Sequence, residues 1–163
     1  MIASEPRLLI VRSTPLVSQM HEVRHFTDFG LTVVAYVEPF SALDLMEAVP
    51  KVGAPGDGVG QHRALLIDLR KVSLAGVSAA ETRRIVALRK ALLAGTAAEP
   101  AAFLLRSEDD FAYIRMHNLW SEAMGVRDER LTVITEDVEH ALSWLASVTN
   151  QPALVDEMLP HLQ

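Results

Sequence analysis

Hydrophobic and polar positions in the second half of the chain predict strands and helices in alternation. Residues 64–69, 101–105 and 131–134 have apolar side chains at consecutive positions, which is typical of short strands covered on both faces. A longer amphipathic stretch follows each run, starting at about 78, 107 and 135. Because alternating strands and helices form parallel sheets with right-handed crossovers, this order predicts an α/β fold.

The helix predicted over 78–94 has the clearest boundaries. Ser78 and Glu81 fit the S-x-x-E capping box, in which each side chain accepts a hydrogen bond from the other residue's backbone N–H. Gly95 can end the helix. Its apolar side is expected to comprise residues at helical spacing, namely Ile85, Leu88 and Leu92.

The helix predicted over 107–124 begins at Ser107, whose hydroxyl can cap it, and stops before Gly125. Asp109 and Asp110 lie in its first turn, where the helix dipole favours negative charge. Its inner stripe is expected to be Ala112, Met116, Leu119, Trp120 and Ala123. The inward residues of the last long helix are expected to be Val138, Ala141, Leu142 and Leu145.

The first half of the chain contains a segment that periodicity alone does not settle. Residues 8–11 and 31–37 are predicted strands. Residues 15–27 between them combine helical spacing of apolar positions with a weak alternation. We favour a strand over 22–28 that forms a hairpin with 31–37 around Phe29–Gly30, and a helix over 15–27 is the open alternative.

The remaining segments complete the predicted organisation. A helix is predicted over 41–49, and the Gly- and Pro-rich residues 50–62 are interpreted as a mobile surface loop. One domain over 1–150 is then followed by a tail, 151–163, that contains a short amphipathic helix. The apolar face of that helix comprises Leu154, Val155, Met158, Leu159 and Leu162. Because so short a helix is marginal alone, it must dock on its own body or on a second subunit, and we expect a homodimer.

Composition narrows the functional classes. The 163 residues carry a net charge of −6 with a pI near 5.5, which argues against nucleic-acid binding, since that requires a basic face. No apolar run is long enough to span a bilayer or to serve as a signal peptide, so we expect a cytoplasmic protein. The chain has no cysteine, which excludes disulfides, thiol catalysis and Cys-ligated zinc.

Two motifs suggest a metal or a cofactor. Residues 21–25 match the H-E-x-x-H pattern of zinc hydrolases, but Arg24 places a positive charge inside the motif and no third ligand is marked out. The glycine-rich stretch 56–60 precedes a strand instead of following one, so it is interpreted as a linker and not as a phosphate-binding loop. We therefore expect neither a metal nor a cofactor.

Other side chains suit a binding role. Four basic residues of the 78–94 helix can receive an anion or an acidic partner, with a solvated face as the favoured interpretation: Arg83, Arg84, Arg89 and Lys90. Four large apolar residues can line a small-molecule or lipid pocket, with core packing as the favoured interpretation: Met116, Trp120, Met124 and Trp144. Asp68 follows a buried strand, where an aspartate either carries a metal or phosphoryl group or accepts hydrogen bonds from the next loop.

Four motifs carry a resemblance to a known family: RALLIDLR at 63–70, AFLL and FAYIRM within 102–116, ITEDVEHALSWL at 134–145, and the weaker VEPFSALDL at 37–45. On these motifs, residues 31–146 resemble the STAS-like proteins related to bacterial anti-sigma-factor antagonists. The resemblance implies a mixed sheet with parallel strands and with helices packed mainly on one side. It also implies a non-enzymatic regulatory domain that acts by contact with a protein partner.

In that family, a serine that opens the helix after the Asp-Leu strand is phosphorylated by a partner kinase. The corresponding residues here are roughly 76–78, where Ser78 is present and the family's aspartate is absent. The resemblance therefore implies Ser78, Ser73 and Asp68 as candidates for phosphorylation or partner contact. The candidates for anion or partner contact are Arg83, Arg84 and Lys90.

A second resemblance, to response-regulator receiver domains, rests on the runs 8–17, 30–35 and 42–46 and would make Asp68 the phospho-acceptor. The acidic pair that holds magnesium in receivers is replaced by Arg12–Ser13, so this would be a degenerate receiver. Three alternatives thus remain. A helix at 15–27 would favour the receiver, a hairpin there the STAS-like domain, and a closed apolar cavity lined by the large residues of 116–144 a ligand-binding protein.

Overall fold

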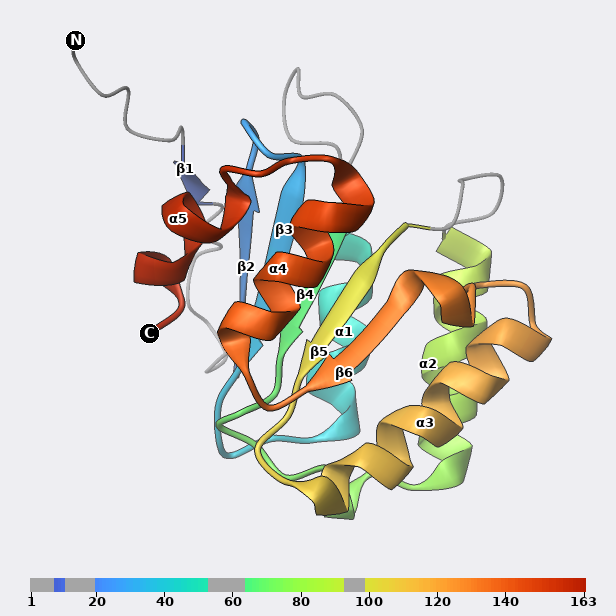
Figure 1. Cartoon of the computed structure of the whole chain (residues 1–163). Helices are drawn as coiled ribbons and strands as arrows, with labels where there is room; N and C mark the ends of the chain where they lie inside the picture. Colours follow the sequence, from blue (N-terminus) through green and yellow to red (C-terminus); the bar gives the residue numbers. More distant parts are fainter. Residues whose placement is uncertain (1–7, 11–19, 53–63, 93–98) are drawn as a thin grey trace, which may run out of the picture.

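The described residues of the protein form one six-stranded mixed sheet with its covering helices. The computed structural model describes residues 8–10, 20–52, 64–92 and 99–163. Neighbouring strands follow one another in chain order across the sheet, which Figure 1 shows edge to edge: β1 (Leu8–Ile10), β2 (His21–Phe26), β3 (Leu31–Tyr36), β4 (Ala64–Asp68), β5 (Ala101–Leu104) and β6 (Thr132–Thr135). β2 pairs antiparallel with both of its neighbours, β1 and β3, and β3 to β6 are parallel. The predicted α/β fold with a mixed sheet is confirmed.

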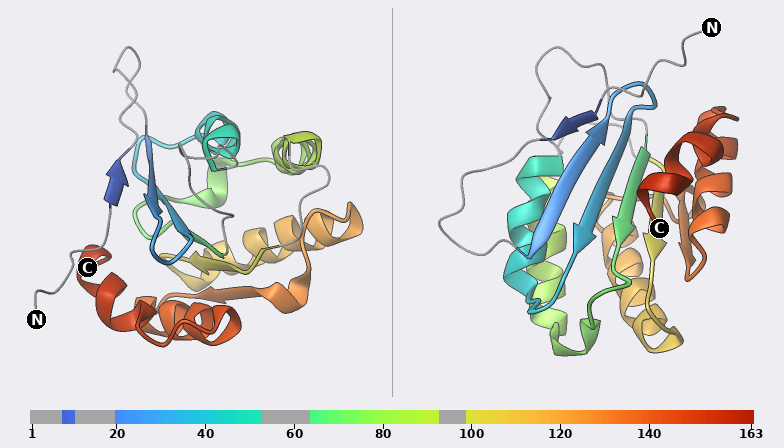
Figure 2. Two further views of the ribbon diagram at one scale, coloured as in Figure 1. Left: turned by 90° about the horizontal axis from the view of Figure 1, so that it is seen from above. Right: turned by 90° about the vertical axis from the view of Figure 1, so that its left-hand side faces the viewer.

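Helices cover both faces of this sheet. One face carries α1 (Ala42–Val52), α2 (Ala79–Leu92) and α3 (Glu108–Ala123). The other carries α4 (Val138–Thr149) and α5 (Leu154–Met158), as the two views of Figure 2 show. Three short 3-10 helices complete the described part: η1 (Leu74–Gly76), η2 (Glu129–Leu131) and η3 (Leu159–His161). None of the described helices is long and apolar enough to cross a membrane.

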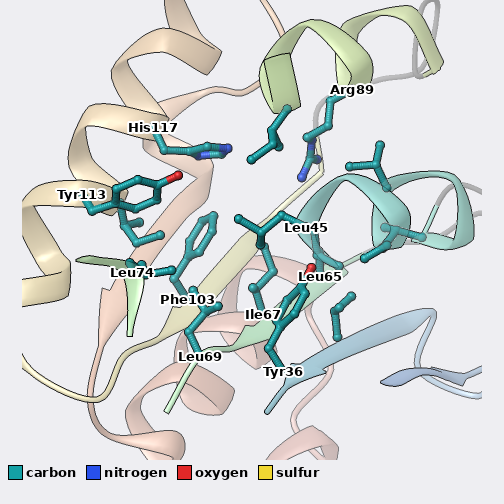
Figure 3. Close-up of a pocket in the computed structure, with 16 residues that line it drawn as sticks. Tyr36, Leu45, Leu65, Ile67, Leu69, Leu74, Arg89, Phe103, Tyr113 and His117 are labelled. Carbon is teal, nitrogen blue, oxygen red and sulfur yellow. The ribbon is translucent and has the colours of Figure 1, made fainter. Parts of the chain in front are cut away.

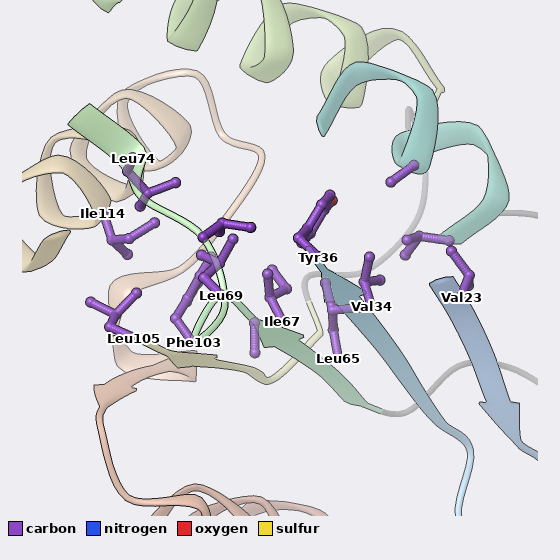
Figure 4. Close-up of a cluster of buried hydrophobic side chains, with 14 residues drawn as sticks. Val23, Val34, Tyr36, Leu65, Ile67, Leu69, Leu74, Phe103, Leu105 and Ile114 are labelled. Carbon is purple, nitrogen blue, oxygen red and sulfur yellow. The ribbon is translucent and has the colours of Figure 1, made fainter. Parts of the chain in front are cut away.

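Each face of the sheet has its own core. Leu65 and Ile67 of β4 point toward α1 to α3, where they join the buried cluster of Figure 4. Ala64 and Leu66 of the same strand point toward α4 and α5 and join a second cluster. All five residues of β4 are buried, as the continuous apolar run predicted.

The predicted hairpin is correct. Residues 21–26 pair with 31–36 in antiparallel register, from His21 opposite Tyr36 to Phe26 opposite Leu31. Gly30 closes the turn with a φ of 59°, a conformation that glycine adopts without steric cost. The favoured strand is therefore confirmed over a helix for residues 20–27, and residues 15–19 lie outside the described part of the chain.

Helix α1 is longer than predicted. Residues 50–52, which we expected in a loop over 50–62, belong to this helix, and residues 53–62 lie outside the described part of the chain. Pro50 stands inside the helix, although proline removes a backbone donor there. Val49 and Val52 are buried against the sheet, and this tertiary packing explains why the helix continues past the proline.

The C-terminal tail packs on its own chain. Leu154 and Met158 are fully buried, and Leu162 nearly so, in the core beneath α4. Gln151 fastens the start of the tail, because its Nε2 donates to the carbonyl oxygen of Phe29 at 2.9 Å. The apolar face from which we expected a homodimer is thus occupied in cis. The homodimer stays a prediction, and its interface has to lie elsewhere.

Candidate functional site

Helix α3 turns a polar face toward the sheet. Its buried residues are Asp110, Ile114, His117, Asn118 and Ser121. The expected apolar stripe was wrong, since Leu119 is 62% and Trp120 37% exposed. Ser107 also makes no side-chain cap bond. Instead, Oδ1 of Asp110 accepts from the backbone N–H of Leu74 at 3.0 Å, which binds the first turn of α3 to η1 and fixes which face turns inward.

Helix α2 likewise buries a charged group. Its inward residues are Thr82, Ile85, Val86 and Arg89, whereas Leu92 is half exposed. Arg89 therefore does not belong to the solvated face on which we expected it. Arg83, Arg84 and Lys90 are exposed as expected, and the guanidinium group of Arg83 lies 4.7 Å from the ring centroid of Trp120. Cation–π stacking of this kind helps to hold the outer sides of α2 and α3 together.

A cavity of about 50 Å³ lies between these helices and the sheet. Its wall is mainly apolar and includes Leu45 of α1, Leu65 and Ile67 of β4, and Phe103 of β5. Four polar side chains complete the lining, namely Tyr36, Arg89, Tyr113 and His117. Figure 3 shows Arg89 and His117 entering from the helices while Tyr36 rises from the sheet. The predicted pocket residues Met116, Trp120, Met124 and Trp144 do not line this cavity.

Arg89 is the unusual member of this lining. The residue is 8% exposed, and its Nε has no hydrogen-bond partner among the described residues. Burial lowers its pKa, and the charge of Glu99 and the nearby Tyr36 hydroxyl act in the opposite direction. Because arginine stays protonated even when its pKa falls, a cation stands in the wall of an apolar cavity.

The other polar groups are neutral at physiological pH. Burial, followed by the positive charges of Arg127 and Arg89, lowers the pKa of His117 to about 3. Burial also raises the pKa of the Tyr36 hydroxyl above its ordinary value. The hydroxyl of Tyr113 lies 2.7 Å from Oγ1 of Thr82, and burial raises its pKa as well. These groups can donate or accept hydrogen bonds but add no charge to balance Arg89.

A second buried cation lies behind Phe103. The guanidinium group of Arg127 is 5.2 Å from the Phe103 ring centroid, and its Nε and Nη2 have no hydrogen-bond partner in the described ranges. Arg89 and Arg127 repel each other, and both are attracted by Glu99. One carboxylate thus faces two buried guanidinium groups. Since buried charges are normally paired, the excess positive charge of this region would attract an added anion.

The H-E-x-x-H motif is not a helical metal site. It lies on β2, where residues four apart are about 13 Å from each other along the strand. His21 instead approaches α1, and one ligand atom each of His21, Asp44 and Glu47 lie within 4.8 Å of one another. However, Nζ of Lys51 lies 2.8 Å from Nε2 of His21. A lysine at the imidazole supplies the positive charge that a metal would bring, so we assign no metal to this cluster.

The residues implied by the family resemblance, Asp68, Ser73 and Ser78, lie between the end of β4 and the start of α2, and they are not among the lining residues of the cavity. Asp68 is tied to Arg70, which donates to both carboxylate oxygens at 3.0 and 2.8 Å and adds its backbone N–H at 3.1 Å. The interpretation of Asp68 as an acceptor for the next loop is therefore confirmed. Ser73 caps η1 by accepting from the backbone N–H of Ala75 at 3.4 Å.

Ser78 and Glu81 form the predicted capping box. The backbone N–H of Glu81 donates to Oγ of Ser78 at 3.2 Å, and the backbone N–H of Ser78 donates to Oε2 of Glu81 at 2.8 Å. The Ser78 hydroxyl also donates to that same oxygen at 2.8 Å. These hydrogen bonds lower the pKa of Glu81. Ser78 is exposed at the start of α2, so it is open to a partner as well as being a cap.

A larger polar groove of about 420 Å³ lies where β3 and β4 end and the tail returns. Its charged residues include Arg24, Asp68, Arg70 and Lys71. Asp68 and Arg70 neutralise each other, and Nε of Arg24 lies 3.9 Å from Glu22. Its charges are largely paired, unlike those of the apolar cavity, which is therefore the stronger candidate site.

Sequence reasoning missed Tyr36, His117 and Arg127 altogether and placed Arg89 on the wrong face. A signal for Arg89 was present, because it continues the Thr82 and Ile85 stripe at helical spacing. Family models, curated proteins and solved structures offer no match to this chain.

Proposed function

We propose that this protein is a non-enzymatic binding domain whose site is the cavity between the sheet and α1 to α3. The observation that carries the proposal is a cavity in the core between the sheet and α1 to α3. It is lined mainly by large apolar side chains. Protein interiors are normally packed without voids of this size. The contacts that a ligand adds by filling about 50 Å³ of apolar space are worth on the order of 1 kcal/mol.

The polar groups of the lining support binding more than catalysis. A histidine whose pKa is about 3 is a poor general base or acid near neutral pH. The raised pKa of Tyr36 likewise disfavours a phenolate nucleophile. Both groups suit the fixed hydrogen bonds that orient a ligand in an apolar pocket.

The size of the cavity limits its ligand. About 50 Å³ is far below the roughly 300–1,000 Å³ of pockets for drug-sized molecules. A slender molecule, such as a single unbranched hydrocarbon chain, suits this space best. Leu45 of α1 and Tyr113 of α3 are half-buried residues of the lining. A shift of the Leu45 side chain would admit a longer chain.

Straight-chain alcohols of increasing length test the proposal, because they are apolar and carry no charge. We expect them to raise the melting temperature and to shift the amide resonances of lining residues such as Ile67 and Phe103. Val34→Ile adds one methylene toward the cavity and should weaken this binding. Val33→Ile adds the same group on the opposite face of β3 and should leave binding unchanged. Absence of binding by any alcohol would refute the proposal.

A second candidate is the regulatory protein-interaction domain that the STAS-like resemblance implies. The β2–β3 hairpin favours it over a receiver, and the exposed Ser78 offers a place for a modification or a partner. The expected cytoplasmic location and homodimer belong to this proposal. A pulldown from the native cell, repeated with Ser78→Asp, tests it. A partner retained by the wild type and lost by the variant would support the candidate.

A further inference from the structure

We propose that the ligand of the cavity is an amphiphilic monocarboxylate, with its carboxylate on Arg89 and its hydrocarbon chain among Leu45, Ile67 and Phe103. This inference rests on the proposed binding function and adds the chemical class of the ligand. It comes from the net positive charge of the site, which an uncharged apolar ligand would leave without a counter-charge.

The positive charge at the cavity lacks a dedicated partner. Arg89 is buried, lines the cavity and leaves its Nε without a hydrogen bond in the described part of the chain. The carboxylate of Glu99 is shared with Arg127, which is buried as well. Because the Nε of Arg89 is a buried donor without an acceptor and one carboxylate serves two buried cations, an anion that enters the cavity would be attracted by the uncompensated positive charge.

The geometry suits a carboxylate. A guanidinium group is planar and presents parallel N–H donors that match the two oxygens of a carboxylate. Figure 3 shows the nitrogen atoms of Arg89 and the hydroxyl of Tyr36 facing the same space from α2 and from β3. Because its raised pKa keeps that hydroxyl protonated, Tyr36 can donate a further hydrogen bond to the anion.

The charge count favours a single negative charge. Arg89 and Arg127 carry two positive charges, and Glu99 carries one negative charge. His117 stays neutral because its pKa is about 3. One monoanion balances the cluster, whereas a phosphate monoester would bring excess negative charge into a buried site. Beyond Arg89, the cavity wall is mainly apolar, which requires the rest of the ligand to be hydrocarbon.

The test compares octanoate, 1-octanol and octyl phosphate by isothermal titration calorimetry on the full chain. Octanoate has seven alkyl carbons, and 1-octanol and octyl phosphate have eight. The shorter chain works against octanoate, so a preference for octanoate would come from its carboxylate. We expect octanoate to bind about tenfold or more tightly than 1-octanol, since a charged hydrogen-bonded pair is worth that much. The Nε–Hε resonance of Arg89 should shift with octanoate and not with 1-octanol.

Arg89→Met removes the charge and keeps an unbranched, flexible side chain that is shorter than that of arginine. We expect it to lose the preference for octanoate, and to be about as stable as the wild type, because removal of a buried cation without a dedicated partner offsets the lost packing. Arg115→Met removes an exposed arginine of α3 and should keep the preference for octanoate. The affinities of the three probes for the wild type test the inference without any variant, so the test remains valid even if a variant folds poorly.

The outcomes separate this inference from the proposed function. Binding of 1-octanol without a preference for octanoate would overturn the monocarboxylate and leave the apolar binding site intact. Tighter binding of octyl phosphate than of octanoate would also overturn it. Preference for octanoate that survives in Arg89→Met would place the carboxylate elsewhere and refute the role of Arg89. If no probe binds, the proposed function fails together with the inference.

Discussion

Arg70 and Leu162 are far apart in the sequence, yet Nη2 of Arg70 donates to the carbonyl oxygen of Leu162 at 2.6 Å. The same guanidinium group holds the carboxylate of Asp68 at the end of β4. A single side chain therefore joins the carboxyl end of a central parallel strand to the last turn of the tail. Both Asp68 and Arg70 are largely shielded from solvent, which strengthens their interaction.

Arg70→Met should lower the free energy of unfolding by about 1–3 kcal/mol, because it leaves the carboxylate of Asp68 without its ion-pair partner. Urea unfolding measures this loss, and limited proteolysis should show earlier cleavage of the tail. Asp128 and Arg130 repeat the same Asp-x-Arg geometry on the surface, where Arg130 is 90% exposed. Arg130→Met should therefore cause no measurable change, and an equal loss in both variants would contradict the role of Arg70.

The tail should stabilise the fold within one chain. Met158→Ala removes a fully buried side chain from the core beneath α4 and should cost about 2–5 kcal/mol in urea unfolding. If the tail docks in cis, this cost is the same at low and high protein concentration, since no subunit association is involved. A stability that rises with concentration in the wild type and not in the variant would instead show docking on a second subunit.

His117 should make the protein less stable in mild acid. Its pKa is about 3 in the folded chain and about 6.5 when unfolded, so the unfolded chain binds the proton first. The contribution of His117 is fully present above pH 6.5 and is lost as the pH falls toward 3. Below pH 6.5 the loss approaches about 1.4 kcal/mol for each pH unit.

Urea unfolding at several pH values checks this dependence. His117→Gln should flatten the curve of stability against pH, and the quantity compared is the slope of the free energy of unfolding against pH. His140→Gln changes an exposed histidine on α4 and should leave the curve unchanged. A curve that keeps its full slope in His117→Gln would show that another group takes up the proton.

Ser78→Ala should cost about 1 kcal/mol, because the backbone N–H of Glu81 loses its acceptor. Ser78→Asn supplies a new acceptor and should restore most of this stability. Ser78→Asp should restore less, because its carboxylate would face Oε2 of Glu81, which now accepts from the serine hydroxyl. Thermal unfolding measures all three variants.

The same repulsion applies to a phosphate at Ser78. A phosphoryl group would lose the hydroxyl hydrogen bond and face the Glu81 carboxylate, so modification would open the capping box. Glu81→Gln removes that repulsion and should rescue the stability of Ser78→Asp. If Ser78→Asp is as stable as the wild type with Glu81 intact, the side chains do not interact as the structure shows.

The sequence by itself determined the local features. The capping box depends on residues three positions apart, and its hydrogen bonds form wherever the helix forms. The short apolar run of β4 favours a strand covered on both faces, and the weak alternation before Gly30 favours the hairpin over the helix that was the alternative. These predictions succeeded because each rests on interactions between near neighbours in the chain.

Only the tertiary structure decided which side of α3 is buried and which groups the charged residues Asp110, Arg89 and Arg70 contact. The apolar stripe with Leu119 and the polar stripe with His117 both have helical spacing, so periodicity could not choose between them. The choice depends on Asp110 binding η1, and the burial of Arg89 depends on helices distant in sequence. Arg70 likewise has a partner 92 positions away. The Thr82 and Ile85 stripe could show that Arg89 turns inward, but not what it meets there, because contacts of this range are created by the packing of the whole chain.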